Sequence, residues 1–146
     1  MNPGIQAQID DLNILISQLT RRVENLRQEM SQARSRKARV EELSAMHKRA
    51  VEGFYADHHA LTGIISSTRN MSRVKAALGF AGILDETIRG NICDKALDDI
   101  EAVEQAVKRE LRRLNDSIID RMRETNLIEN EIAALKRRVR LLSLGA

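Results

Sequence analysis

Apolar residues recur at alternating spacings of four and three near both ends of the chain. In the N-terminal part these residues are Ile5, Ile9, Leu12, Ile16, Leu19, Val23, Leu26, Met30 and Ala33. Near the C-terminus they are Ile128, Ile132, Leu135, Val139 and Leu142. A hydrophobic period of about 3.5 residues keeps one narrow stripe facing a partner helix, which is typical of a coiled coil. We call these two sets the N-terminal seam and the C-terminal seam, and they predict an all-α protein.

The composition agrees with long, thin helices. The chain has 146 residues, of which 42% are hydrophobic but only 2% aromatic, so there is little material for a thick core. Its one proline, Pro3, precedes the first seam residue, where a proline is tolerated at a helix start. No other proline interrupts either seam, and long uninterrupted helices are therefore allowed.

Three breaks are predicted between the seams. The first helix should run from Ile5 to about Leu61, with a looser apolar stripe after Met30 that continues through Val40, Leu43, Met46, Ala50 and Phe54. Glycine, Ser, Thr and Asn residues over 63–72 predict the first break. A short helix over 73–78 then leads to a second break at 79–82, and Gly90-Asn91 predicts a third, with Asn91 capping the final helix over 92–142.

Aligning the seams in opposite directions predicts a hairpin. When Ile5 is set against Leu142, the midpoint falls near Arg73 and Val74, inside the region of predicted breaks. The predicted fold is a long antiparallel coiled-coil hairpin forming one domain over 1–146, with an arm over 5–62, a tip of short broken helices over 63–91 and an arm over 92–142. The exposed flanks of such a hairpin allow a further pairing into a four-helix assembly.

A parallel homodimer is the alternative to the hairpin. One position of the N-terminal seam holds β-branched residues and the other holds leucine, which is the choice that favours parallel two-stranded coiled coils. The β-branched residues are Ile9, Ile16 and Val23, and the leucines are Leu12, Leu19 and Leu26.

Polar residues interrupt the predicted core at Lys37, Arg121 and Thr125. Such interruptions lower stability and can select the register or the partner of a coiled coil. Surplus apolar residues outside the seams are candidates for contact with a partner, and they are Leu15, Ile83, Leu84, Ile119 and Leu127.

Catalytic and ligand-binding chemistry is not predicted. Neighbouring histidines on a helix point about 100° apart, so His58 and His59 cannot readily clasp one ion, and a solvated edge explains Asp57 and His58 better. Cys93 is the single cysteine and is expected to be a small buried hydrophobe. No phosphate-binding glycine loop or nucleophile motif occurs, so we expect neither an enzyme nor a cofactor or metal site. An acidic group on the final helix can pair with a basic helix opposite; its members are Asp94, Asp98, Asp99, Glu101 and Glu104.

Nucleic acid and membranes are disfavoured as partners. Basic residues cluster over 34–39 and 136–140, but stacking aromatic residues are missing and the net charge is only +3. No apolar run approaches the length of a membrane span, and no secretory signal is recognisable, so we expect a cytoplasmic protein, with export by a route that accepts folded helices left open.

The stretch Phe80-Ala81-Gly82 between two helical arms resembles the WxG-type small helical-hairpin proteins of type VII secretion, in particular the YwqH-like partners of LXG-type toxins. The resemblance implies that Phe80 and Gly82 form a turn that packs helix ends together and contributes to an interaction surface. Tyr55 is followed four residues later by His59 instead of the acidic residue of the family's export signal. The resemblance therefore implies a chaperone or targeting partner of a toxin in preference to an exported effector.

The sequence thus predicts a non-enzymatic helical binding module that forms a helix bundle with a secreted toxin, with itself, or with both. Two alternatives stay open: a prefoldin-like or adaptor coiled coil that holds clients at its arm tips, and a basic coiled coil associated with nucleic acid. The first lacks the strand-forming residues expected at the arm bases, and the second predicts binding that falls steeply with salt.

Overall fold

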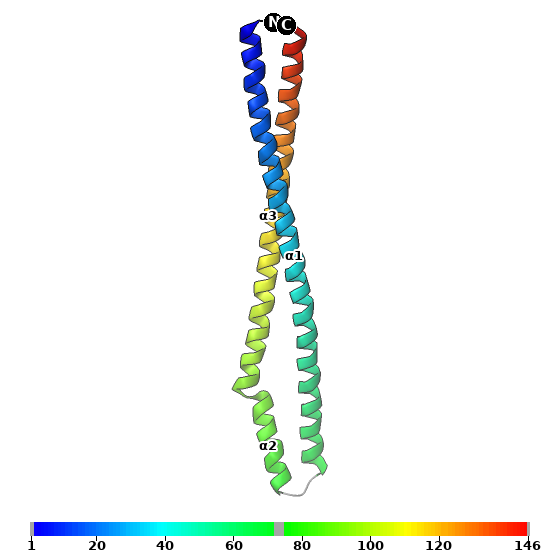
Figure 1. Ribbon diagram of the computed structural model, residues 1–146. Coiled ribbons are helices and arrows are strands. Elements are labelled where there is room, and N and C mark those ends of the chain that lie inside the picture. Colours follow the sequence, from blue (N-terminus) through cyan, green and yellow to red (C-terminus); the bar gives the residue numbers. More distant parts are fainter. Residues whose placement is uncertain (1, 72–74, 146) are drawn as a thin grey trace. The chain divides into compact units, whose positions relative to one another are not determined.

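A computed structural model describes residues 2–71 and 75–145, which form three α-helices and no strand (Figure 1). Helix α1 spans Pro3–Met71, α2 spans Lys75–Arg89 and α3 spans Asn91–Gly145. The prediction of an all-α helical hairpin is confirmed. The chain divides into two compact units, which are described separately below: unit 1 comprises Met1–Ala38 and Arg112–Ala146, and unit 2 comprises Arg39–Leu111.

Asn2 caps the start of α1. The Gly4 N–H donates to Asn2 Oδ1 at 2.9 Å, and the Gln6 N–H donates to the Asn2 carbonyl at 3.1 Å. Pro3 takes the first helical position, where its missing N–H would have had no partner within the helix. Helix α1 therefore begins slightly before the predicted start at Ile5.

The predicted break over 63–72 is wrong, because α1 continues through Gly63 to Met71. A single helical glycine costs only about 1 kcal/mol. Packing can outweigh that cost, since Ile65 is buried in the core of unit 2. The Thr62 hydroxyl donates to the His58 carbonyl at 2.9 Å, so this side chain is accommodated in the helix. The predicted midpoint at Arg73 and Val74 lies outside the described residues.

The predicted break at 79–82 is also wrong. Gly79, Phe80, Ala81 and Gly82 all lie within α2, so the expected aromatic turn is a helix. Ala81 is fully buried in a cluster with Ile65 and Ile88, against which Leu84 packs. Burial of this one face holds α2 in helical form despite its two glycines.

The break at Gly90-Asn91 is confirmed, since α2 ends at Arg89 and α3 begins at Asn91. The capping residue is Gly90 instead of Asn91, because the Asp94 N–H donates to the Gly90 carbonyl at 3.1 Å. A Cβ placed at Gly90 would collide with the backbone carbonyl oxygen of Glu86, whereas one placed at Gly79 would meet nothing within 4 Å.

We therefore expect opposite effects from two glycine replacements. Gly90→Ala should lower the free energy of unfolding by about 1–3 kcal/mol, because backbone must move to admit the methyl group. Gly79→Ala should raise it by about 0.5–1 kcal/mol, because alanine is the better helix former at an open site. Urea denaturation of both variants measures the difference, and equal effects would contradict the close approach at Gly90.

The packing of unit 1 follows the two seams. All the residues of the N-terminal and C-terminal seams are buried or half-buried. The buried residues of unit 1 are Ile9, Val23, Leu26, Met30, Leu114, Ile118 and Thr125, and each continues the four-and-three spacing. Leu26 is fully buried, with a relative exposure of 0%.

Helices α1 and α3 run in opposite directions in unit 1, which contains both ends of the chain (Figure 1). Arg22, directly before seam residue Val23, pairs with Glu124, which directly precedes Thr125, at 2.9 Å. Arg27 pairs with Glu129 at 2.5 Å, and both residues directly follow a seam residue. In antiparallel coiled coils, residues that precede a seam residue on both helices lie side by side, as do residues that follow one. In parallel coiled coils, a residue that precedes a seam residue pairs with one that follows a seam residue.

The ion pair between Glu29 and Arg121 indicates the register of unit 1. Antiparallel layers combine the two different seam positions, and the alignment nearest to this contact sets Met30 opposite Arg121 and Leu26 opposite Thr125. Continued along the seams, this register sets Ile9 opposite Leu142. The predicted pairing of Ile5 with Leu142 is therefore wrong: both occupy the same heptad position, whereas antiparallel layers combine the two different seam positions.

The inward face of α1 in unit 2 also differs from the prediction. Leu43 and Met46 were expected to continue the apolar stripe, but both are exposed. The half-buried residues keep the seam spacing instead, and they are Val40, Ser44, His47, Val51, Phe54 and His58. Continuity of the heptad thus places polar side chains inside unit 2 and leaves large apolar ones outside.

Candidate functional site

Arg121 and Thr125 are two successive polar residues at core positions of α3 in unit 1, and we call them the polar step. The Arg121 guanidinium donates from Nε to Glu29 Oε2 at 2.8 Å and from Nη1 to the Ser117 carbonyl at 3.3 Å and the Ser117 hydroxyl. The Thr125 hydroxyl donates to the Arg121 carbonyl at 2.7 Å. The Arg121 guanidinium thus lies at the edge of the core, where it binds a carboxylate on α1. The Thr125 hydroxyl has its hydrogen-bond partner within α3.

Lys37 is half-buried in the same unit and lies four residues after Ala33, where the N-terminal seam would continue. The predicted core placement of Lys37, Arg121 and Thr125 therefore agrees with their burial. A register shift would move Arg121 away from Glu29, so this ion pair can help to select one alignment of the strands. Selection of register or partner by these residues remains a prediction.

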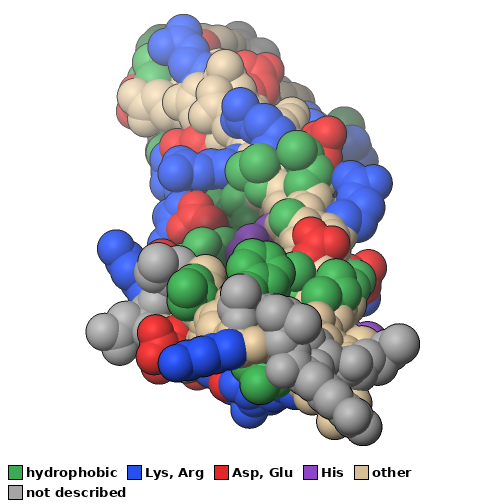
Figure 2. All heavy atoms as spheres, turned by 90° about the horizontal axis from the view of Figure 1, so that it is seen from below, with side chains coloured by type: hydrophobic (Ala, Val, Ile, Leu, Met, Phe, Trp, Pro, Cys, Tyr) green, Lys and Arg blue, Asp and Glu red, His purple; other side chains and the backbone are tan. Residues whose placement is uncertain are grey.

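The predicted tip residues do not form a turn surface. Phe80 is exposed on a face of α2 away from Ala81 and Ile88, together with Ile83, whose relative exposure is 65%. Gly82 is half-buried inside the helix. Leu84, predicted to face a partner, instead packs against the core of unit 2. Figure 2 shows hydrophobic side chains at the surface between charged ones in the view from below.

The other predicted partner-facing residues are exposed in unit 1. Leu15 on α1 and Ile119 on α3 are moderately exposed, and Leu127 has a relative exposure of 70%. Because each lies outside the seam spacing, none is needed to hold the two strands of unit 1 together.

Unit 2 contains an apolar groove between α1 and the α2–α3 junction, which we call the unit-2 groove. It consists of two hollows of about 240 and 330 Å³ that share Phe54 and Ala96. The first is also lined by Asp57, His58, Leu61, Thr87, Ile88 and Cys93, and the second by His47, Ala50, Val51, Asp99 and Ile100. Small side chains such as Ala50, Cys93 and Ala96 leave this space between the helices.

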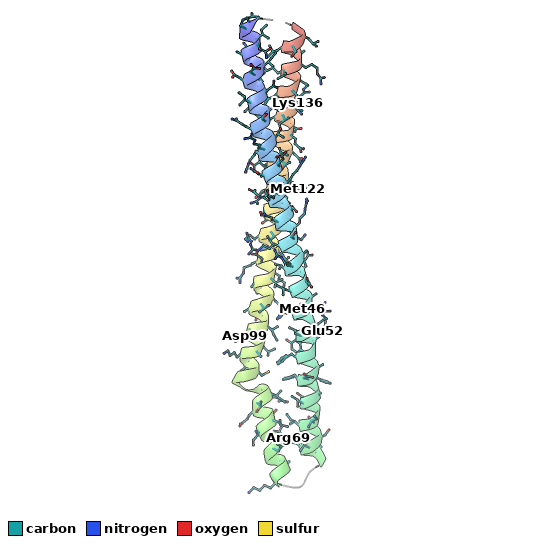
Figure 3. All side chains as sticks on the ribbon, in the orientation of Figure 1. Met46, Glu52, Arg69, Asp99, Met122 and Lys136 are labelled. Carbon is teal, nitrogen blue, oxygen red and sulfur yellow. The ribbon has the colours of Figure 1, made fainter. Side chains whose placement is uncertain are left out.

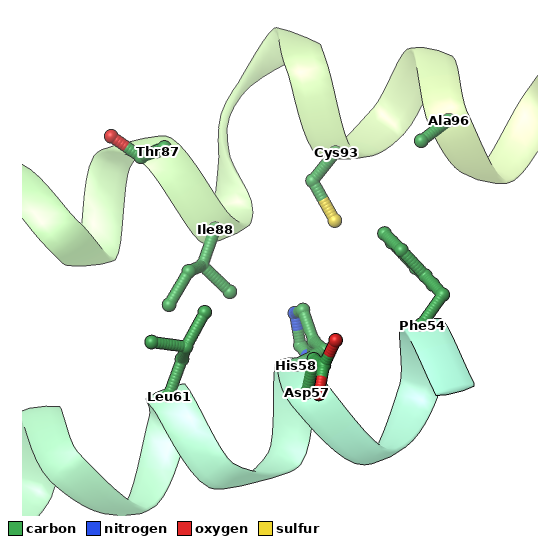
Figure 4. Close-up of a pocket in the computed structure, with 8 residues that line it drawn as sticks. All are labelled: Phe54, Asp57, His58, Leu61, Thr87, Ile88, Cys93 and Ala96. Atoms are coloured by element: carbon green, nitrogen blue, oxygen red, sulfur yellow. The ribbon is translucent and has the colours of Figure 1, made fainter. Parts of the chain in front are cut away.

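Figure 4 shows how the first hollow is built. Leu61 and Ile88 face each other across it, while the Cys93 sulfur points from α3 towards α1 beside Phe54 and His58. Cys93 is buried, as predicted. His58 is half-buried and lies at a tilt against Phe54, with ring centroids 6.3 Å apart, whereas Asp57 is exposed.

The acidic group of the final helix lies on α3 of unit 2, and one of its members, Asp99, lines the unit-2 groove. The predicted pairing of this acidic group with a basic helix is not observed: within residues 2–71 and 75–145, no ion pair involves these carboxylates, which belong to Asp94, Asp98, Asp99, Glu101 and Glu104. Figure 3 shows Asp99 on α3 and Glu52 on α1 in this unit. In contrast, Asp85 on α2 is paired, with Arg89 Nε at 2.9 Å and Arg69 at 3.4 Å.

The part of the chain that the structure describes holds no cluster of three His, Cys, Asp or Glu side chains suited to a metal ion. In the same residues, no helix combines the length and apolar character needed to cross a membrane. Comparisons with protein-family models, curated proteins and solved structures find no match. The exposed surfaces and the groove are therefore the features of this chain that bear on its function.

Sequence reasoning did not find the unit-2 groove. Its lining mixes residues from all three helices, and the predicted stripe through Leu43 and Met46 pointed to the wrong face of α1. The signal that could have found it is the unbroken heptad spacing from Val40 to His58, which places His47 and His58 inside.

Proposed function

We propose that this chain is a non-enzymatic helical binding module that completes a helix bundle with a helical region of another protein. One observation carries the proposal: large apolar side chains stand exposed outside the contacts that hold each unit together. In unit 2 the outer face of α2 presents Phe80 and Ile83, and in unit 1 Leu127 is 70% exposed. Exposed apolar faces of this kind often mark protein contacts, since burying them releases about 25 cal/mol per Å².

The mechanism we propose is helix-in-groove or helix-on-helix packing. A partner with an apolar stripe would cover these faces, and flanking charges would select its orientation. The partner class implied by the sequence resemblance is the N-terminal helical region of an LXG-type toxin, which would make the chain a chaperone or targeting partner. Because Phe80 and Gly82 lie in a helix, the turn motif does not support this partner class. The exposed apolar faces support the binding of a helix in general.

Co-expression with the helical region of an LXG-type toxin encoded beside the chain tests the proposal. We expect a complex that co-elutes on size exclusion, and we expect Phe80→Glu combined with Ile83→Glu to weaken it at least tenfold without loss of helicity. Leu43→Glu, also on an exposed apolar side chain of unit 2, is the matched control. Failure to form a complex with the toxin or with any helical protein recovered from native lysate would refute the binding role.

A further inference from the structure

Asp99 is the carboxylate that lines the unit-2 groove from α3. It belongs to a stretch, from Asp94 to Glu104, that holds five carboxylates and a single basic residue, Lys95. All five carboxylate side chains are exposed. Asp57 adds a carboxylate from the α1 wall. An apolar groove edged in this way is complementary to a helix that combines apolar side chains with basic ones.

The C-terminal part of α3 has these properties. Leu141 and Leu144 are 69% and 78% exposed, and the seam of unit 1 uses Leu142 instead. Arg137 and Arg140 are also exposed and, among the described residues, take part in no ion pair. The outer face of this helix therefore presents leucines and arginines together, with no contact inside unit 1 that needs them.

We propose that the unit-2 groove of one copy binds the outer face of the C-terminal part of α3 from a second copy. Leu141 and Leu144 enter the two hollows, and Arg137 and Arg140 lie against Asp57 and Asp99. Cavities of about 150 Å³ admit benzene, which is larger than a leucine side chain. Hollows of about 240 and 330 Å³ therefore have room for these side chains. The proposal does not depend on the toxin partner proposed above.

We propose a dimer as the assembly, because each copy has one groove and one such helix face, and two equivalent contacts would leave neither face exposed. The pairing should weaken with salt, because its charged groups are solvent-exposed at the rim.

The mass of the full chain in solution is the first test. At about 100 µM protein and low salt, we expect light scattering to give twice the chain mass of 16.5 kDa. Replacing both Leu141 and Leu144 with serine should raise the dissociation constant at least tenfold. Ile14→Ser, at an exposed apolar side chain on α1 of the same unit, should leave the constant unchanged.

Charge reversal identifies the two surfaces. The variants Arg137→Glu/Arg140→Glu and Asp57→Arg/Asp99→Arg should each be monomeric, because like charges then meet in both contacts. An equimolar mixture of the two should regain the dimer mass, since opposite charges again meet at both contacts. Circular dichroism of each variant checks that helicity is retained.

The proposal is overturned if the native chain has the mass of a monomer at this concentration. It is equally overturned if either charge-reversed variant remains dimeric, if their mixture stays monomeric, or if Ile14→Ser weakens association as much as the leucine replacements do. Because these measurements use the chain alone, they are independent of whether a toxin partner binds.

Discussion

Replacing Leu26 with alanine should lower the free energy of unfolding by about 2–5 kcal/mol, the range for truncating a fully buried leucine. Leu26 is 0% exposed and lies at the centre of the ion-paired region of unit 1. Chemical denaturation followed by circular dichroism measures the change.

Leu127→Ala is the matched control for this prediction. It removes the same atoms from the same unit, but Leu127 lies outside the seam and is 70% exposed. Its effect should stay within about 0.5 kcal/mol. Comparable losses for the two variants would contradict the assignment of the unit 1 core to the seam.

Replacing Arg121 with leucine should have the opposite sign and raise the free energy of unfolding by about 1–2 kcal/mol. Leucine suits this seam position, and the ion pair with Glu29 is partly exposed, so its loss costs little. We also expect the register to become less unique, because the leucine no longer prefers one alignment over another. Spin labels at Gln8 and Ser143 would show this as a broader distance distribution.

The control for Arg121 is Arg123→Leu, which makes the same chemical change at an exposed position of the same helix. It should leave both the stability and the distance distribution nearly unchanged. If Arg121→Leu instead destabilises the chain, the polar step contributes net stability and the proposed trade of stability for register is wrong.

Unit 1 was largely predictable because a coiled coil repeats one rule along its length. The residues from Ile5 to Ala33 and from Ile128 to Leu142 pack as the heptad pattern predicted, and Thr125 is buried where the pattern placed it. The register was not predictable from the apolar residues alone, because any shift by a whole heptad preserves their pattern. The contact of Glu29 with Arg121 distinguishes the alignments.

Unit 2 was predicted less well, because local signals there compete with packing. Glycine at 63, 79 and 82 suggested breaks, yet each lies within a helix. Burial of Ile65, Ala81 and Ile88 in one cluster supplies the stabilisation that local propensity lacks. Only Gly90, where a side chain would collide with the helix backbone before it, ends a helix as predicted.

By itself the sequence determined the helical class and the inward face of unit 1, because hydrophobic periodicity acts through neighbours a few residues apart. It favoured the hairpin, but a parallel dimer was also compatible with the seams. Only the tertiary structure decided the register, the true break points and the unit-2 groove. The register and the break points depend on which side chains meet between helices that are distant in sequence. The groove depends on whether the side chains that face each other are large enough to fill the space between the helices. The two seams therefore determine the fold of unit 1, whereas the exposed apolar surfaces outside them are the proposed sites of binding.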